Sequence, residues 1–254
     1  MFELDQFQEI YQTVSRHKLR TALTAFGVFW GIFMLVLLLG AGKGLENGAL
    51  GMFGHLAKNS IWVWGGRTTV PYSGLKPGRT ITFSLEDIKA MKRDLPELNY
   101  VAPGTSLVGN YTVNYQNKYG SFRVGGDFPD INNIRAVNVL EGRFLNQNDI
   151  DDARKVAIIG TRVVEILFDK QEAIGKYIEI KGVFFQVVGV FEPFSSGGDG
   201  RNDAEKIFIP LTTLHKAYNM TQVTSIAINP KKGVDPSELE SKVKQYLANR
   251  HKVS

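Results

Sequence analysis

The sequence predicts an α+β protein: one N-terminal transmembrane helix, followed by an extracytoplasmic domain in which a β-rich part is inserted into an α/β platform. Three observations lead to this prediction. Residues 21–42 form one uncharged apolar stretch, helical patterns recur near both ends of the remaining chain, and strand patterns dominate its middle. The mean hydropathy of −0.11 averages over these unequal regions, so by itself it resembles the value for a soluble protein.

The overall composition is that of an ordinary globular chain. The 254 residues are 43% hydrophobic and 22% charged, which permits a substantial core and excludes disordered and collagen-like chains. The chain contains no cysteine, so its fold does not depend on disulfides. The net charge of +5 is dispersed and lacks an accompanying aromatic platform, so no nucleic-acid partner is expected.

The first element is a membrane span from Thr21 to Gly42. A helix rises about 1.5 Å per residue, so about 20 apolar residues cross a hydrocarbon core about 30 Å thick. A buried core helix would be shorter and would show a polar face. A cleaved signal peptide is the stronger alternative, because Gly40, Ala41 and Gly42 resemble a cleavage site. We interpret the segment as an uncleaved signal anchor.

Charges beside the span predict its orientation. Arg16, Lys18 and Arg20 lie immediately before the span. On the other side Lys43 is the only basic residue that follows closely, with Glu46 beside it. Because basic flanks stay cytoplasmic, the N-terminus is expected inside the cell and residues 43–254 outside the membrane.

Residues 1–20 predict a cytoplasmic amphipathic helix. Apolar side chains recur at spacings of three and four, at Leu4, Phe7, Ile10, Tyr11 and Val14. Such a stripe fits a helix lying on the inner membrane surface, and it fits equally well a helix packed on a protein partner.

The outer region begins with strand and helix signals. Residues 61–64 predict a strand, and residues 65–79 a loop rich in glycine and proline. Ser84, with Asp87 three residues later, predicts the capped start of a helix over 84–95. Together with a strand ending at Val101, these elements predict a βαβ-like unit.

The middle of the chain predicts mainly strands. Hairpins are expected around the turns at Gln116–Lys118 and Lys181–Gly182. A buried strand at 155–160 precedes a short helix through Leu167, and an exposed loop is expected at 192–203. The β-rich part then covers about residues 108–205.

The platform is expected to include the end of the chain. Residues 206–211 and 225–229 predict strands, and Asp235 precedes a closing helix with Pro236 in its first turn. The platform accordingly comprises about residues 43–107 and 206–254.

No catalytic, cofactor or metal site is predicted. The four histidines, at positions 17, 55, 215 and 251, are scattered. The carboxylates of Asp149, Asp151 and Asp152, and those of Asp199 and Asp203, are interpreted as solvated loop residues. The GAGKG segment at 40–44 lacks the spacing of a phosphate-binding loop. An anchored hydrolase therefore has no nucleophile–base pair, and the chain is not expected to be an enzyme.

A series of motifs resembles the MacB- and FtsX-type permeases of ABC transporters. It begins with the basic corner HKLRTALT and the glycine-containing span. It continues with Gly142-Arg143-Phe144 before Asp149, then the strand ending VAIIG at 156–160, and Gly175-Lys176. It ends with IFIPLT at 207–212. The resemblance covers roughly residues 15–230 through an ordered series of motifs, none of which is decisive alone.

The resemblance implies a bacterial inner-membrane subunit whose periplasmic domain combines a porter-like α/β part with an inserted β-rich part. Implied partners are a cytoplasmic ABC ATPase, membrane lipid, a second permease, and periplasmic adaptor or outer-membrane components. The implied function is coupling of ATP hydrolysis to export of peptides, lipoproteins or drug-like substrates. Gly142, Gly160 and Gly175 are expected at turns.

The sequence departs from that family after its closing helix. The family continues into a stalk and three further spans, whereas this sequence stops at Ser254. We therefore expect an N-terminal fragment or a natural truncation that does not transport alone. The alternative function is a membrane-anchored periplasmic adaptor or binding module.

Overall fold

The structure is a computed structural model that describes residues 18–53, 60–72, 74–107, 109–135, 137–192 and 203–253; side chains of 46–53 are not described. The predicted amphipathic segment up to residue 17, with Arg16, lies outside the described residues, as do residues 193–202 of the predicted exposed loop. The chain divides into two compact units, Met1–Met52 and Phe53–Ser254.

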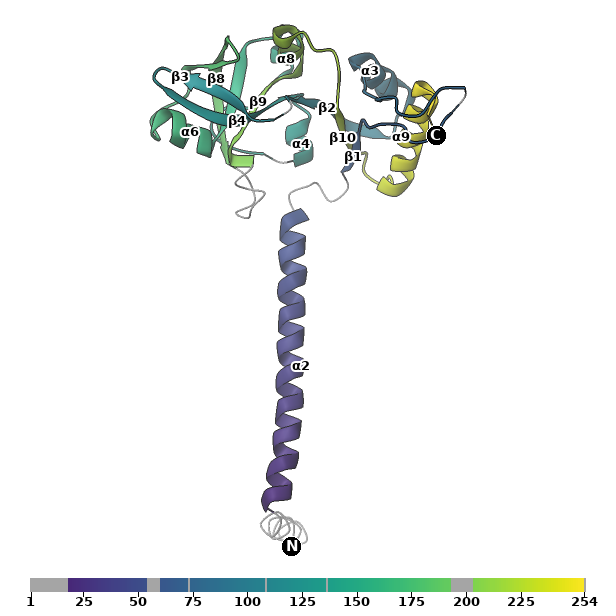
Figure 1. The fold of residues 1–254 in the computed structure, drawn as a ribbon, viewed down its shortest axis with the longest axis vertical. Helices are drawn as coiled ribbons and strands as arrows, with labels where there is room; N and C mark the ends of the chain where they lie inside the picture. The colour runs from purple at the N-terminus through teal and green to yellow at the C-terminus, as the bar shows by residue number, and fades with distance from the viewer. Residues whose placement is uncertain are drawn as a thin grey trace. The chain divides into compact units, whose positions relative to one another are not determined.

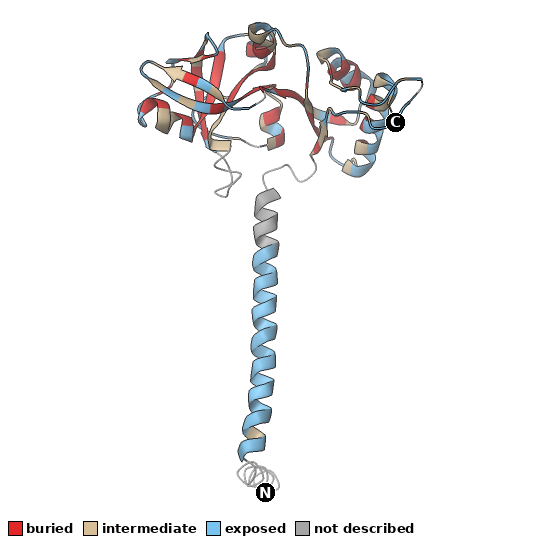
Figure 2. Ribbon diagram, viewed as in Figure 1, coloured by how far each residue is buried: buried red, intermediate tan, exposed pale blue. Residues whose placement is uncertain are grey.

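The N-terminal unit contains the helix α2 (Lys18–Phe53). Among the described residues it is the one helix long and apolar enough to cross a membrane, over Lys18–Leu45. None of its apolar window is buried, unlike a core helix, and Figure 2 shows these residues as exposed. The helix continues through the glycine-rich segment after Gly42, so it is longer than the predicted span.

The outer unit contains a three-stranded platform in the order β1 (Ile61–Trp64), β10 (Ser225–Pro230), β2 (Leu98–Ser106). Both neighbouring pairs are antiparallel, so β1 and β2 run parallel with β10 between them. The helix α3 (Leu85–Asp94) connects β1 to β2, and α9 (Pro236–His251) follows β10. The predicted βαβ unit therefore exists in split form, with a third strand between its two strands.

The two faces of the platform are covered by different helices. Val101 and Ile228 are register partners and belong to a core with residues of α3 and α9. Their neighbours Ala102 and Ala227 point to the opposite face and pack with α4 (Ile131–Arg135). Because side chains alternate along a strand, short runs of consecutive apolar residues supply both faces.

A second set of strands forms a closed ring of pairings, β4–β3–β7–β8–β6–β9–β4. Its members are β3 (Tyr111–Tyr115), β4 (Lys118–Asp127), β6 (Val156–Gly160), β7 (Tyr177–Ile180), β8 (Val183–Glu192) and β9 (Lys206–Pro210). The β4–β9 and β6–β8 pairs are parallel and the other pairs are antiparallel. We call this ring the barrel; it is seen opposite α9 in Figure 1.

The barrel encloses its own hydrophobic core. Phe122, Ile159, Phe185 and Ile207 are fully or almost fully buried there, and α6 (Thr161–Phe168) packs against the ring. One further strand, β5 (Asn138–Gly142), pairs with the end of β8. The α+β fold class predicted from the sequence is confirmed.

Several local signals are confirmed at the predicted residues. Ser84 caps α3: its Oγ accepts from the Asp87 amide at 3.2 Å, and its own amide donates to the Asp87 carboxylate at 2.8 Å. Lys181 and Gly182 have φ of 49° and 82°, the backbone of a two-residue hairpin turn. Asp235 caps α9.

The helix α8 (Leu211–Tyr218) lies between the barrel and the platform. Leu211 belongs to the platform core, whereas Leu214 belongs to the barrel core. Since β9 pairs with β4 and β6, we propose that the β-rich part extends to about the end of α8; the division at residues 108 and 205 stays a prediction.

Candidate functional site

The described residues contain no group of three or more histidine, aspartate or glutamate side chains placed to hold a metal ion. Arg143 and Phe144 of the motif series instead lie beside one buried carboxylate, Asp149. Its side chain has no solvent exposure. The interpretation of Asp149 as a solvated loop residue was wrong, whereas Asp151 and Asp152 are exposed.

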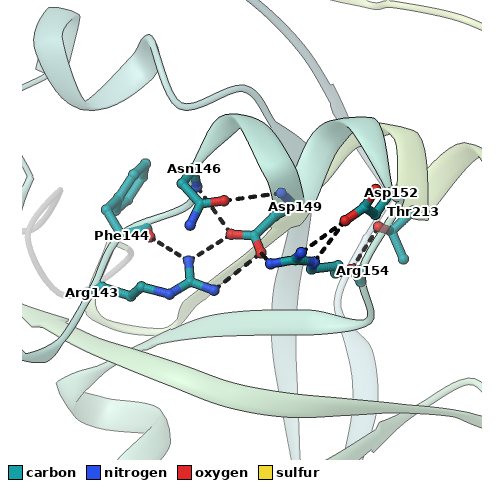
Figure 3. Close-up of polar contacts among 7 residues, drawn as sticks. All are labelled: Arg143, Phe144, Asn146, Asp149, Asp152, Arg154 and Thr213. Carbon is teal, nitrogen blue, oxygen red and sulfur yellow. Dashed lines mark hydrogen bonds and ion pairs between the residues drawn. The ribbon is translucent and has the colours of Figure 1, made fainter.

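Asp149 lies near the start of the short helix α5 (Gln147–Asp151) and forms a reciprocal cap with Asn146. The Asp149 amide donates to Asn146 Oδ1 at 3.0 Å, and the Asn146 amide donates to Asp149 Oδ2 at 3.0 Å. This arrangement fixes the backbone turn and directs the carboxylate inward (Figure 3).

Two arginines complete the environment of this carboxylate. Arg143 donates to both Asp149 oxygens, at 2.6 and 3.1 Å, which is the fork geometry that binds carboxylates strongly. Arg154 Nη1 lies 3.9 Å from Asp149 Oδ1, and Arg154 Nη2 pairs with exposed Asp152 at 2.8 Å. Figure 3 shows the two guanidinium groups meeting at Asp149. We call Arg143, Asn146, Asp149 and Arg154 the Asp149 cluster.

The cluster is attached to α8 by two hydroxyl groups. Thr213 Oγ1 donates to the Arg154 carbonyl at 2.8 Å, and Thr212 Oγ1 donates to the Ile150 carbonyl at 2.5 Å. Thr213 is itself buried. The motif at 207–212 and the motif at 142–149, far apart in sequence, therefore lie on either side of one contact, between the start of α8 and the segment around α5.

Glycines of the motif series allow close backbone approach. Gly142 has φ of +73°, and a Cβ at this position would overlap the Val188 carbonyl. Gly175 also has a positive φ, of +80°, but has open space around it. Gly160 is the N-cap residue where β6 passes directly into α6; its φ is −73°, and glycine is needed there because a Cβ would overlap the Ala204 carbonyl.

The platform and the barrel meet where β2 passes from β10 to β4. Gly104 on β2 pairs with β10, whereas the next residue, Thr105, pairs with Gly126 of β4. Thr105 Oγ1 donates to the Gln222 carbonyl at 2.6 Å, in the connection after α8. The junction is thus a strand crossing reinforced by hydrogen bonds.

A largely buried ion pair lies beside this crossing. Lys206 Nζ is 3.7 Å from Asp127 Oδ2 and 4.2 Å from the centroid of the Phe208 ring. Burial lowers the pKa of Lys206, and the Asp127 carboxylate opposes that shift. Lys206 also lines a cavity of about 510 Å³, together with Arg123, Arg135 and Asp203.

The predicted membrane-flanking residues lie where the helix begins. Lys18 and Arg20 are in the first turn of α2, and Thr21 and Gly42 lie within the same helix. Arg16 is outside the described residues. The boundaries of the membrane span and the role of the basic cluster stay predictions.

Sequence reasoning missed that Asp149 pairs with Arg143 and that the threonines hold the cluster. The sequence did contain a signal that the Asp149 carboxylate is ordered: Asn146 and Asp149 have the same three-residue spacing as the capping pair Ser84 and Asp87. The contact of Thr213 with Arg154 joins residues 59 positions apart, and no local pattern predicts it.

Comparison with known proteins places the whole of this arrangement in a family. A model of the MacB-like periplasmic core domain matches residues 21–246. The macrolide export ATP-binding/permease protein MacB of Bdellovibrio bacteriovorus is 26% identical over 251 residues, covering 98% of this chain and 38% of that protein. The pyoverdine export ATP-binding/permease protein PvdT of Pseudomonas aeruginosa is 32% identical over 208 residues, covering 82% and 30%.

Solved structures show the same fold at low identity. The periplasmic region of MacB from Actinobacillus actinomycetemcomitans has a TM-score of 0.66 and 17% identity, covering 79% of this chain and 88% of that one. The extracellular domain of the ABC-type transporter YknZ from Gram-positive bacteria has a TM-score of 0.63 and 18% identity, covering 77% and 96%. The sequence thus spans less than two fifths of the length of these curated relatives, but most of each solved outer domain.

Proposed function

This chain belongs to the MacB-like periplasmic core domain family, and on that premise we propose that it is the N-terminal part of an ABC transporter membrane subunit. It couples ATP hydrolysis by a separate cytoplasmic ATPase to movement of its outer domain, for export of peptides, lipoproteins or drug-like molecules. The chain itself is not an enzyme. The supporting observation is that the family match begins at Thr21, where the uncharged apolar stretch 21–42 begins, and continues through the outer domain to residue 246.

The chain is a membrane-anchored protein with an outer domain of periplasmic type. We propose that it lies in the bacterial inner membrane with its N-terminus cytoplasmic and residues 43–254 periplasmic. The basic residues Arg16, Lys18 and Arg20 support this orientation. Membrane lipid, a second copy of the permease, and periplasmic adaptor or outer-membrane components are proposed as its further partners.

The Asp149 cluster supports a mechanical role for the outer domain. It fixes the segment around α5 to α8, and α8 contributes to the cores of both the barrel and the platform. A domain built in this way transmits displacement as a body, because packed interiors are not continuously deformable. We propose that the spans move this domain as one lever.

The orientation can be tested with single cysteines, because the natural chain has none. Lys170→Cys lies on the outer unit at a side chain that is 78% exposed, and Gln12→Cys lies before the span. In intact spheroplasts, a membrane-impermeant maleimide should label Lys170→Cys, whereas Gln12→Cys should react only after permeabilisation. The opposite pattern would show a reversed orientation.

The ATPase partnership can be tested by gentle detergent extraction of the tagged chain from its own bacterium. We expect an ATP-binding subunit to co-purify, and ATP turnover to be absent from the chain purified alone. A tagged, unrelated single-span protein serves as the control. Recovery of periplasmic proteins without any ATP-binding subunit would instead favour the anchored adaptor.

A further inference from the structure

The outer unit contains an open cavity of about 640 Å³ between the segment 63–83 and the last turns of α9. This volume falls in the range of about 300–1,000 Å³ that is usual for small-molecule sites. The cavity lies on the platform, so it is separate from the Asp149 cluster. Part of its wall is the loop at 65–79, which the composition predicted but for which it gave no role.

The loop forms this wall because it folds back on itself as an irregular hairpin. Isolated bridges pair Arg67 with Thr80 and Tyr72 with Leu75. The Arg79 guanidinium then donates to the His251 and Lys252 carbonyls, at 2.8 and 3.4 Å. Arg79 thereby occupies carbonyls at the C-terminal end of α9 and holds the hairpin against it.

The cavity has an apolar floor and an aromatic rim. Phe83 and Leu247 are buried at its base. Trp64, Val70 and Tyr72 line it from the hairpin side and are 66%, 51% and 41% exposed. Three large apolar side chains left in water around one cavity indicate a surface that contacts an apolar group.

The charged groups lining the cavity all have one sign. They are the side chains of Arg67, Lys76, Arg79, Lys244 and Lys252, and His251 lines the cavity with them. None of the lining residues that the structure describes is acidic. Lys244 is paired with Glu240 at 2.5 Å, and Arg79 caps α9. The remaining cations of Arg67, Lys76 and Lys252 form no ion pair with any side chain in the described parts of the chain.

The buried carboxylate of Asp87, which lies beside the cavity-lining His251, does not neutralise these cations. Asp87 is held by Arg250 and by the cap of α3, and His251 Nε2 lies 3.3 Å from its carboxylate. Burial opposes ionisation of Asp87, but the hydrogen bonds from Arg250 and Ser84 outweigh it and keep its pKa below the usual value. The positive charge at the cavity is therefore available to a ligand.

From this geometry we propose that the cavity binds a single-chain anionic amphiphile, with its apolar body along Phe83 and Trp64. Its carboxylate or phosphate head group would contact Arg67, Lys76 and Lys252. Arginine and lysine are the side chains that bind such groups through charge-assisted hydrogen bonds. The proposal depends on the cavity alone and does not require that the chain take part in transport.

The test uses the full chain in lipid nanodiscs with photoreactive hexadecanoic acid, followed by peptide mapping of the crosslinks. We expect labelling within residues 63–83 and 244–253. The triple variant Arg67→Gln, Lys76→Gln, Lys252→Gln should reduce this labelling about tenfold, the effect of losing charge-assisted contacts. The matched triple variant Lys155→Gln, Lys176→Gln, Lys232→Gln, at exposed positions outside the cavity, should leave it unchanged.

Two further probes decide the chemistry. Photoreactive hexadecanol, which lacks the charge, should label the cavity about tenfold less than the acid. A phosphate monoester of the same chain should label it, and its ratio to the acid identifies the preferred head group. Labelling confined to α2, or equal labelling by acid and alcohol, would overturn the proposal. If the cavity is labelled but no ATP-binding subunit co-purifies in the extraction experiment, the proposed amphiphile site stands and only the transport function is rejected.

Discussion

Replacing Asp149 with alanine should lower the free energy of unfolding by about 3 kcal/mol. The substitution removes a buried carboxylate that accepts hydrogen bonds from Arg143 and from the Asn146 amide. Hydrogen bonds to charged groups contribute about 1.5–3 kcal/mol each, and removal of one partner of a buried pair costs about 3–5 kcal/mol. We expect the lower end of the range for a broken buried pair because the Arg143 side chain is 41% exposed, so water can solvate its guanidinium once the carboxylate is removed.

The measurement is urea unfolding of the purified chain in detergent, together with hydrogen exchange of residues 143–154. Asp152→Ala is the matched control in the same segment: its side chain is 59% exposed, so we expect a change below about 0.5 kcal/mol. Asp149→Asn keeps the capping acceptor but removes the charge, and should fall between the two. Equal losses for Asp149→Ala and Asp152→Ala would refute the structural role of the cluster.

Replacing Gly142 with alanine should destabilise the chain by about 3 kcal/mol, clearly more than the same change at Gly175. Both positions have positive φ, which costs an L-residue about 1–2 kcal/mol. At Gly142 the new methyl group would also overlap the Val188 carbonyl, whereas at Gly175 nothing lies within contact distance. The backbone at Gly142 therefore has to move, which disturbs the β5–β8 pairing.

The two glycine variants form their own control, since the chemical change is identical and only the surroundings differ. Gly175→Ala should cost about 1 kcal/mol, the backbone contribution alone. Their unfolding midpoints in urea give the comparison directly. If the two variants unfold at the same denaturant concentration, close approach of β5 to β8 is not what requires glycine at position 142.

Local elements of this fold could be predicted because their signals are short-range. The cap of α3 at Ser84 and the turn at Lys181–Gly182 each depend on residues no more than three positions apart in the sequence. The split of the βαβ unit could not be predicted in this way. Its middle strand, β10, begins at Ser225, more than a hundred residues after β2 starts at Leu98, and no local pattern indicates which strands pair.

The features of the candidate site likewise divide into those indicated by nearby residues in the sequence and those that depend on long-range packing. Asn146 and Asp149 have a capping spacing that indicates an ordered carboxylate, so half of the cluster was accessible to local reasoning. The contribution of Thr213 was not, because it depends on where α8 packs. His251 was counted among the scattered histidines, yet α9 brings it to the cavity and within 3.3 Å of Asp87.

By itself, the sequence determined the α+β class, the apolar segment from Thr21 to Gly42 and the family, because these depend on composition, periodicity and the order of motifs. Only the tertiary structure decided that the barrel closes through the parallel β4–β9 pair, that Asp149 is buried, and that a hairpin and α9 enclose a cationic cavity. The physical reason is that pairing, burial and enclosure are properties of residues distant in sequence, and each arises only when hydrophobic surfaces from several elements are buried together.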